Sequence, residues 1–119
     1  MAQVLALVDD LFFQAKMLET ARHVGVELRT CSTVDALLGE IAKEAPRLVL
    51  VDLNARDKPI AAIERMQSGS VQVPIVAFLS HVQVELAARA RAAGCNTVMA
   101  RSQFTRDLAT ILSGAKSHS

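Results

Sequence analysis

The sequence predicts an α/β protein in which five short strands alternate with five helices, the pattern of a doubly wound sandwich around a parallel sheet. Two observations predict this class. Short apolar runs rich in β-branched residues, such as residues 4–8 and 48–51, are typical of strands that are buried on both faces. Between these runs, apolar residues recur at intervals of three and four, as they do along one face of a helix, and the connections are short.

The composition is that of one domain whose core is built mainly from aliphatic side chains. The chain has 119 residues, of which 51% are hydrophobic, yet it has no Trp or Tyr and only four Phe. A chain of this length can bury a single core, so we expect one domain over residues 1–119 with a frayed tail from about residue 114 to 119. The formal net charge is +1 and no Lys/Arg cluster occurs, which argues against direct binding of nucleic acid.

Three further features bear on the cellular compartment. Cys31 and Cys95 form no CxxC pair and have no histidine partners at metal-ligand spacing, so we expect reduced thiols. No apolar run approaches the roughly 18 residues of a membrane span. The N-terminus lacks the basic region of a signal peptide. We therefore expect a cytoplasmic protein that does not interact with membranes.

The first half of the chain is predicted to contain three strands, at residues 3–8, 26–31 and 48–52. The helix after the first strand is expected to have Asp10 as its N-cap and Gly25 as its C-cap. The second helix is expected to begin at Ser32 or Thr33. It should end before Pro46, because the residue before a proline avoids helical geometry.

The second half is predicted to contain strands at residues 74–79 and 97–100 and helices at residues 60–67, 82–93 and 103–113. Pro74 would stand at the first residue of its strand, where a missing backbone donor matters least. Gly94 is expected to end one helix, and Ser102 is expected to cap the next. His81, which follows the fourth strand, is expected to be a surface residue.

Polar side chains follow four of the five predicted strands: Asp9 and Asp10, Asp52, Ser80, and Arg101. Ligand sites in open parallel sheets lie beyond the carboxyl ends of the strands. If the first and third strands are neighbours, three carboxylates meet at one edge, and a cation or a proton must relieve their repulsion. Oxygen ligands of this kind suit Mg²⁺. Any one of these acids could be only a helix cap or a loop residue, but their joint occurrence favours a site.

These positions resemble the receiver domain of bacterial two-component response regulators, and the resemblance, which includes Ala93-Gly94 before the last strand, covers nearly the whole chain. It implies a flavodoxin-like sheet in the order 2-1-3-4-5. It also implies that Asp52 is the phosphoacceptor, with Ser80 and a basic residue, here Arg101, beside the phosphoryl group. The implied ligands of Mg²⁺ are Asp9, Asp10, Asp52 and the backbone carbonyl of Asn54.

The chain also departs from the family pattern. Arg101 stands where the family has lysine, and a guanidinium fork does not replace a compact ammonium. The loop at residues 55–59 lacks the usual Met-Pro and glycine, and Val98 occupies the position of the switch aromatic. The segment after the acidic pair is unusually apolar, so a ring of Phe12 or Phe13 could cover the acids.

Three functions are compatible with these residues. The first is a stand-alone, non-enzymatic signalling domain that takes a phosphoryl group on Asp52 from a histidine kinase and binds partners accordingly. The second is a pseudo-receiver that binds a protein partner constitutively, with Arg101 permanently paired to Asp52. The third is a flavodoxin-like domain that binds a small molecule or nucleotide, although GxGxxG, Walker and glycine-rich phosphate motifs are absent. The oligomeric state is left open.

Overall fold

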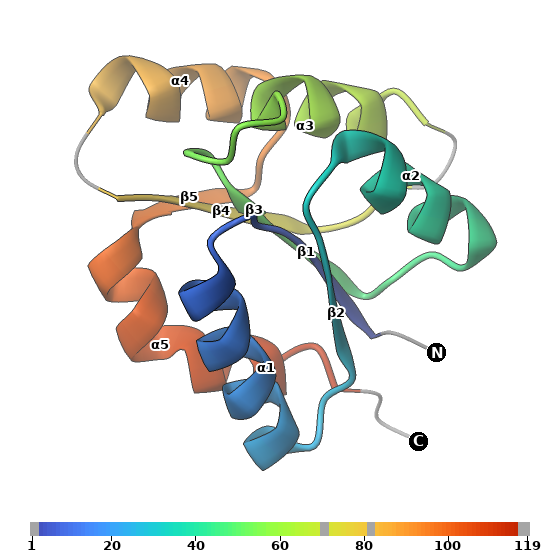
Figure 1. Ribbon diagram of the computed structural model, residues 1–119. Coiled ribbons are helices and arrows are strands. Elements are labelled where there is room, and N and C mark those ends of the chain that lie inside the picture. The colour runs from blue at the N-terminus through green and yellow to red at the C-terminus, as the bar shows by residue number, and fades with distance from the viewer. Residues whose placement is uncertain (1–2, 70–71, 81–82, 117–119) are drawn as a thin grey trace.

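The structure, a computed structural model, describes residues 3–69, 72–80 and 83–116 (Figure 1). Its sheet has five parallel strands: β1 (Val4–Leu7), β2 (Leu28–Cys31), β3 (Leu48–Asp52), β4 (Ile75–Leu79) and β5 (Thr97–Ala100). The spatial order is β2-β1-β3-β4-β5. The predicted class, the parallel pairing and the strand order are therefore confirmed.

Five helices cover the two faces of this sheet: α1 (Leu11–Val24), α2 (Val34–Lys43), α3 (Pro59–Gln67), α4 (Val84–Ala92) and α5 (Arg101–Ser113). Figure 1 shows α1 and α5 on one face and α2, α3 and α4 on the other. Each face has its own apolar core, one with Phe104 and Met17 and the other with Leu37 and Ile63. Such a two-faced sheet needs apolar residues at successive strand positions, which explains the unbroken runs in the sequence.

The central strands place the carboxylates. Every residue of β1 and of β3 is buried, whereas the residues of the edge strand β5 are partly exposed. In the register of β1 with β3, Leu7 lies beside Val51, so the segments that follow these two strands leave the sheet next to each other. The acidic pair after β1 and Asp52 at the end of β3 consequently meet at one edge.

Most helix boundaries follow the predicted caps. Asp10 accepts a hydrogen bond from the backbone N–H of Phe13 (3.1 Å), and Thr33 does the same for Ala36 (3.1 Å). Gly25 ends α1 in the left-handed region, at φ 75°. The second helix stops at Lys43, before the proline, as predicted.

Several boundaries differ from the prediction. Strand β2 begins at Leu28 rather than at residue 26, and β4 begins at Ile75, one residue after Pro74. The predicted cap at Ser102 is wrong, because α5 begins at Arg101 with Ala100 as an N-cap that makes no side-chain hydrogen bond. This earlier start places a cationic side chain at the first position of the helix, directly after the last strand.

Both cysteines, Cys31 and Cys95, are buried free thiols, as predicted. Burial is the main cause that raises the pKa of each thiol. In the described ranges, no helix has the length and apolar character needed to cross a membrane. Three parts of the sequence predictions lie outside the described residues: His81, residue 82 of the fourth helix, and residues 117–119 of the tail.

Candidate functional site at the carboxyl edge of the sheet

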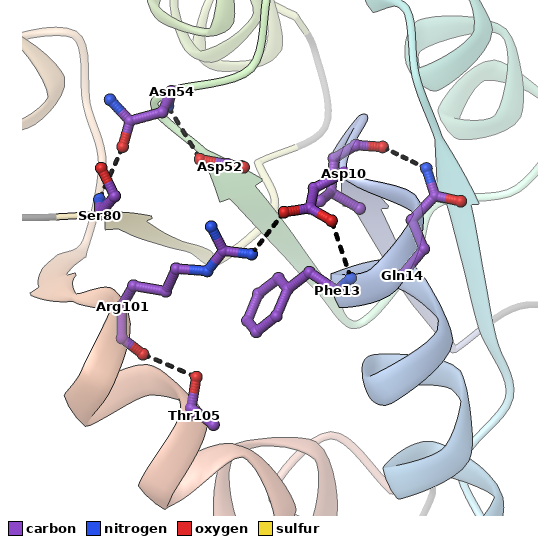
Figure 2. A network of polar contacts seen from close by, with 9 residues as sticks. Asp10, Phe13, Gln14, Asp52, Asn54, Ser80, Arg101 and Thr105 are labelled. Carbon is purple, nitrogen blue, oxygen red and sulfur yellow. Dashed lines mark hydrogen bonds and ion pairs between the residues drawn. The ribbon is translucent and has the colours of Figure 1, made fainter.

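Asp10 lies at the turn from β1 into α1, and both of its carboxylate oxygens are engaged. Oδ1 accepts the capping hydrogen bond from the backbone N–H of Phe13, and Oδ2 pairs with Nη2 of Arg101 at 3.0 Å (Figure 2). The backbone N–H of Phe13 is the main cause that lowers the pKa of Asp10, and the hydrogen bond from Arg101 adds to it. Asp10 is therefore a firmly ionised carboxylate.

Arg101 reaches Asp10 from the first turn of α5, across the face of an aromatic ring. Its guanidinium carbon lies 4.0 Å from the centroid of the Phe13 ring. That ring packs edge-on against Phe78 (centroids 5.3 Å apart) and lies 6.0 Å from Phe104, and the latter two rings stack at 4.1 Å. Arg101 thus has two attractive partners, a carboxylate and a π face that is fixed in the core.

The two aromatic residues that follow the acidic pair, Phe12 and Phe13, lie in different environments. Phe12, predicted as a possible cover for the acids, is 91% exposed and packs on nothing that would cover them. Phe13 is buried in the core, and its ring faces the guanidinium of Arg101. The aromatic pair therefore does not close the acidic edge; it supplies one core residue and one exposed apolar side chain.

Asp52 ends β3 and is the buried charged residue of the described chain, with only 4% of its surface exposed. Its Oδ1 accepts a hydrogen bond from the backbone N–H of Asn54 (2.9 Å). Burial is the main cause that raises the pKa of Asp52; the nearby charges of Asp9 and Asp10 raise it further, whereas the Asn54 N–H and Arg101 oppose the shift.

The second oxygen of Asp52 has a different environment from the first. Within the described residues, no hydrogen bond is made to Oδ2 of Asp52, and no fully buried side-chain oxygen or nitrogen lacks a partner. Oδ2 therefore reaches solvent. A carboxylate that is oriented by a backbone N–H through one oxygen, and whose other oxygen accepts no hydrogen bond from the described residues, has the arrangement of an oriented nucleophile.

Asn54 joins the loops that follow β3 and β4. Its side-chain Oδ1 accepts from the backbone N–H of Ser80 (2.6 Å), and its Nδ2 donates to Oε1 of Gln83 (2.9 Å). Sequence reasoning assigned only the backbone carbonyl of Asn54 a role, and it missed the side chain. The signal was present, because asparagine in a loop commonly bonds to nearby backbone. Ser80 is consequently held beside the loop that carries the end of β3.

Two further carboxylates fix the loop after β3. Asp9 accepts a hydrogen bond from the backbone N–H of Arg56 (2.9 Å), and Asp57 accepts one from the backbone N–H of Val34 at the start of α2 (2.7 Å). Lys58, just before α3, adopts a left-handed conformation at φ 39°, which is uncommon for a side-chain-bearing residue. Asp57 was not singled out from the sequence, since its partner lies at the start of α2, 23 positions away.

The predicted magnesium ligands do not fit the ion in this arrangement. The structure brings Asp9, Asp10 and Asp52 to one edge, but in residues 3–69, 72–80 and 83–116 no three acidic, histidine or cysteine side chains converge on a common metal position. The physical reason is that Asp10 is committed to a helix cap and to Arg101, while Asp9 holds the backbone of Arg56. The cation present at this edge is a guanidinium.

No protein-family model matches the chain, and no curated protein matches it. Solved structures do. The receiver domain of NtrX from Brucella abortus is 23% identical, with a TM-score of 0.80 over 94% of this chain and 96% of that one. A putative response regulator from Chloroflexus aurantiacus is 21% identical, with a TM-score of 0.79 over 97% and 98% of the two chains.

A third similar structure is a CheY-like response regulator receiver domain protein from Methanospirillum hungatei, which is 16% identical with a TM-score of 0.82 over 96% of this chain and 92% of that one. Identities this low report on the architecture. The chain therefore has the receiver-domain fold, a five-stranded flavodoxin-like sandwich, as the sequence resemblance implied.

Proposed function

We propose that this chain is a receiver-like signalling domain in which Asp52 accepts a phosphoryl group, and that the phosphorylation state of Asp52 governs the binding of a protein partner. The observation that carries this proposal is the state of Asp52: it is buried at the end of β3, one oxygen is held by the N–H of Asn54, and Oδ2 reaches solvent. The solved structures of similar fold include several described as response regulators, which supports the same role.

The proposed step is an in-line displacement at phosphorus. Oδ2 of Asp52 forms the new O–P bond as the P–N bond to a donor phosphohistidine breaks, and the departing imidazole takes up a proton from water. Charge on the equatorial oxygens needs donors in place beforehand. Arg101 and Ser80 are the side chains expected to supply them, since they follow the neighbouring strands β5 and β4.

The donor and partner follow from the same proposal. A histidine kinase or another phosphohistidine protein would supply the phosphoryl group, and a further protein would carry the output, consistent with a cytoplasmic signalling module. The domain itself turns over no substrate of its own in this scheme. The near-neutral charge, +1, supports a protein partner over a direct nucleic-acid partner.

A pseudo-receiver is the second candidate, and one observation favours it. Within the described residues, the three carboxylates predicted to bind Mg²⁺ (Asp9, Asp10 and Asp52) do not converge on a common metal position, and the ion would compete with Arg101 for Asp10. From the sequence, a pseudo-receiver is expected to have Arg101 paired with Asp52. In the structure the guanidinium of Arg101 pairs with Asp10 instead.

Labelling with acetyl phosphate tests the proposal. We expect the wild-type chain to gain one phosphoryl group, seen by intact mass, and to lose it in hydroxylamine as acyl phosphates do. Asp52→Asn should gain none. Asp57→Asn is the matched control, because that carboxylate lies in the same loop but bonds to Val34, and it should label like the wild type.

The labelling is run with and without millimolar Mg²⁺. A wild type that stays unlabelled under both conditions, while folded by circular dichroism, would reject phosphotransfer and leave the constitutive partner-binding role. Labelling that persists in Asp52→Asn would instead place the acceptor at another residue.

A further inference from the structure

Arg101 is held at the acidic edge by three contacts that are independent of any ligand. Its Nη2 pairs with Oδ2 of Asp10 at 3.0 Å, and its guanidinium carbon lies 4.0 Å from the centre of the Phe13 ring. Its backbone carbonyl accepts a hydrogen bond from the hydroxyl of Thr105 (2.8 Å), which ties the first turn of α5. Figure 2 shows this side chain extending from the helix start toward Asp10.

The charges around the guanidinium explain why it stays there. Asp10 and Asp52 both interact electrostatically with Arg101, and the side chain is only 30% exposed, so water screens these interactions incompletely. The ring of Phe13 offers a negative π face on the remaining side. Breaking the pair with Asp10 would therefore cost a charge-assisted hydrogen bond and a cation–π contact together.

A divalent cation bound by Asp10 would compete with contacts that are already made. Both carboxylate oxygens of Asp10 accept a hydrogen bond, Oδ1 from the backbone N–H of Phe13 and Oδ2 from Arg101. The fixed positive charge would also repel a metal ion at short range. Both effects act without any change in the other carboxylates.

We propose that Arg101 is the resident cation of the acidic edge: its guanidinium and a divalent metal ion compete for Asp10, and Arg101 prevails in the unmodified protein. The domain thereby depends less on a free divalent ion to offset the negative charge at this edge. The inference does not rest on phosphorylation of Asp52, because it concerns metal binding by the unmodified chain.

The test compares two substitutions that remove the same charge from the same helix. Arg101→Met keeps an apolar stem over Phe13 but removes the guanidinium. Arg106→Met is the matched control, because Arg106 is exposed on α5 and lies 3.9 Å from Asp107, away from the acidic edge. Both variants have the same net charge, so a general electrostatic effect would appear equally in each.

Binding is measured by titrating the full chain with Mg²⁺ and following backbone amide shifts, with Mn²⁺ broadening to locate the ion. We expect no saturating shifts for wild type or Arg106→Met at millimolar Mg²⁺. Arg101→Met should bind the ion at Asp10 at least about tenfold more tightly, which corresponds to about 1.4 kcal/mol. Adding Asp10→Asn to Arg101→Met should remove the new binding.

Two outcomes would overturn the proposal: wild type binding Mg²⁺ as tightly as Arg101→Met, or a folded Arg101→Met that gains no affinity. If Arg101→Met fails to fold, Arg101→Gln replaces it with the same expectations. Since no phosphodonor is present, a failure here is distinct from a failure of Asp52 to accept a phosphoryl group.

Discussion

The carboxyl ends of β1 and β3 are neighbours in the sheet, yet they treat an aspartate in opposite ways. At the end of β1, Asp10 is 39% exposed at its side chain, caps a helix and pairs with a guanidinium, and its pKa is lowered. At the end of β3, Asp52 is almost wholly buried, accepts a hydrogen bond from the backbone N–H of Asn54, and has a raised pKa because of its burial. Two aspartates at the ends of neighbouring strands thus have different environments.

The division has a physical origin in the backbone. Asp10 begins a helix, so its side chain turns toward the N–H groups of the first turn and the exposed end of the molecule. Asp52 is still part of its strand, so its side chain remains in the buried layer of the sheet. Where neighbouring carboxyl groups have pKa values pushed apart, one can serve as a permanent charge and the other as the reactive group. Under the proposed function, Asp10 is the permanent charge and Asp52 is the reactive group.

The largest expected effect comes from removing the ring that supports Arg101. Phe13→Ala should lower the free energy of unfolding by about 3–5 kcal/mol, since it empties a core position beside two other rings. Phe12→Ala should change it by less than about 0.5 kcal/mol, because that side chain is exposed. Urea unfolding followed by circular dichroism measures both. Equal losses in the two variants would contradict the separate placement of these rings.

A smaller change in the free energy of unfolding, of opposite sign, is expected when Asp52 at the end of β3 is replaced. Asp52→Asn should raise the free energy of unfolding at neutral pH by about 1 kcal/mol, because it removes a charge from a buried position. The raised pKa sets the pH dependence: the wild type loses stability as pH rises from the ordinary aspartate range through the raised pKa. The two proteins should therefore converge in acid. A variant that is less stable than wild type at neutral pH would show that the charge of Asp52 is well compensated.

The smallest change in stability is expected when Asp10, which follows β1, is replaced. Asp10→Asn keeps an N-cap side chain but loses the charge that faces the Phe13 N–H and Arg101, so the cap weakens and the ion pair is lost. Because the pKa of Asp10 is lowered, the advantage of wild type is present at neutral pH and disappears as pH falls below the ordinary aspartate range. Thermal melts across pH, at low and high salt, measure it. An advantage that grew in acid, or that ignored salt, would contradict the ion pair.

Much of the architecture was open to prediction because it depends on short-range periodicity. The buried runs at β1 and β3, the caps Asp10 and Thr33, and the terminating Gly25 are each read from a few consecutive residues. The start of α5 was not predicted, because it does not follow from local residue preferences. Serine is a common N-cap, but α5 begins one residue before Ser102 and has no side-chain cap.

Only part of the candidate site could be predicted in this way. The sequence shows that acids follow β1 and β3, and parallel strands bring their ends together. It does not show the side-chain partners within the site, because Asp10 and Arg101 are 91 positions apart, and Asn54 and Ser80 are 26 apart. Which carboxylate a guanidinium selects depends on loop positions and on the ring it crosses, here Phe13.

The sequence by itself therefore determined a parallel α/β sandwich with aspartates at the carboxyl ends of adjacent strands, since hydrophobic period and capping chemistry act over a few residues. Only the tertiary structure decided that Arg101 pairs with Asp10, and that Asp52 is buried with one oxygen held by the Asn54 N–H. The reason is that charge and burial act through space: the environment of a carboxylate is set by side chains from three different segments, and their distances exist only once the sheet and its two helical layers have assembled.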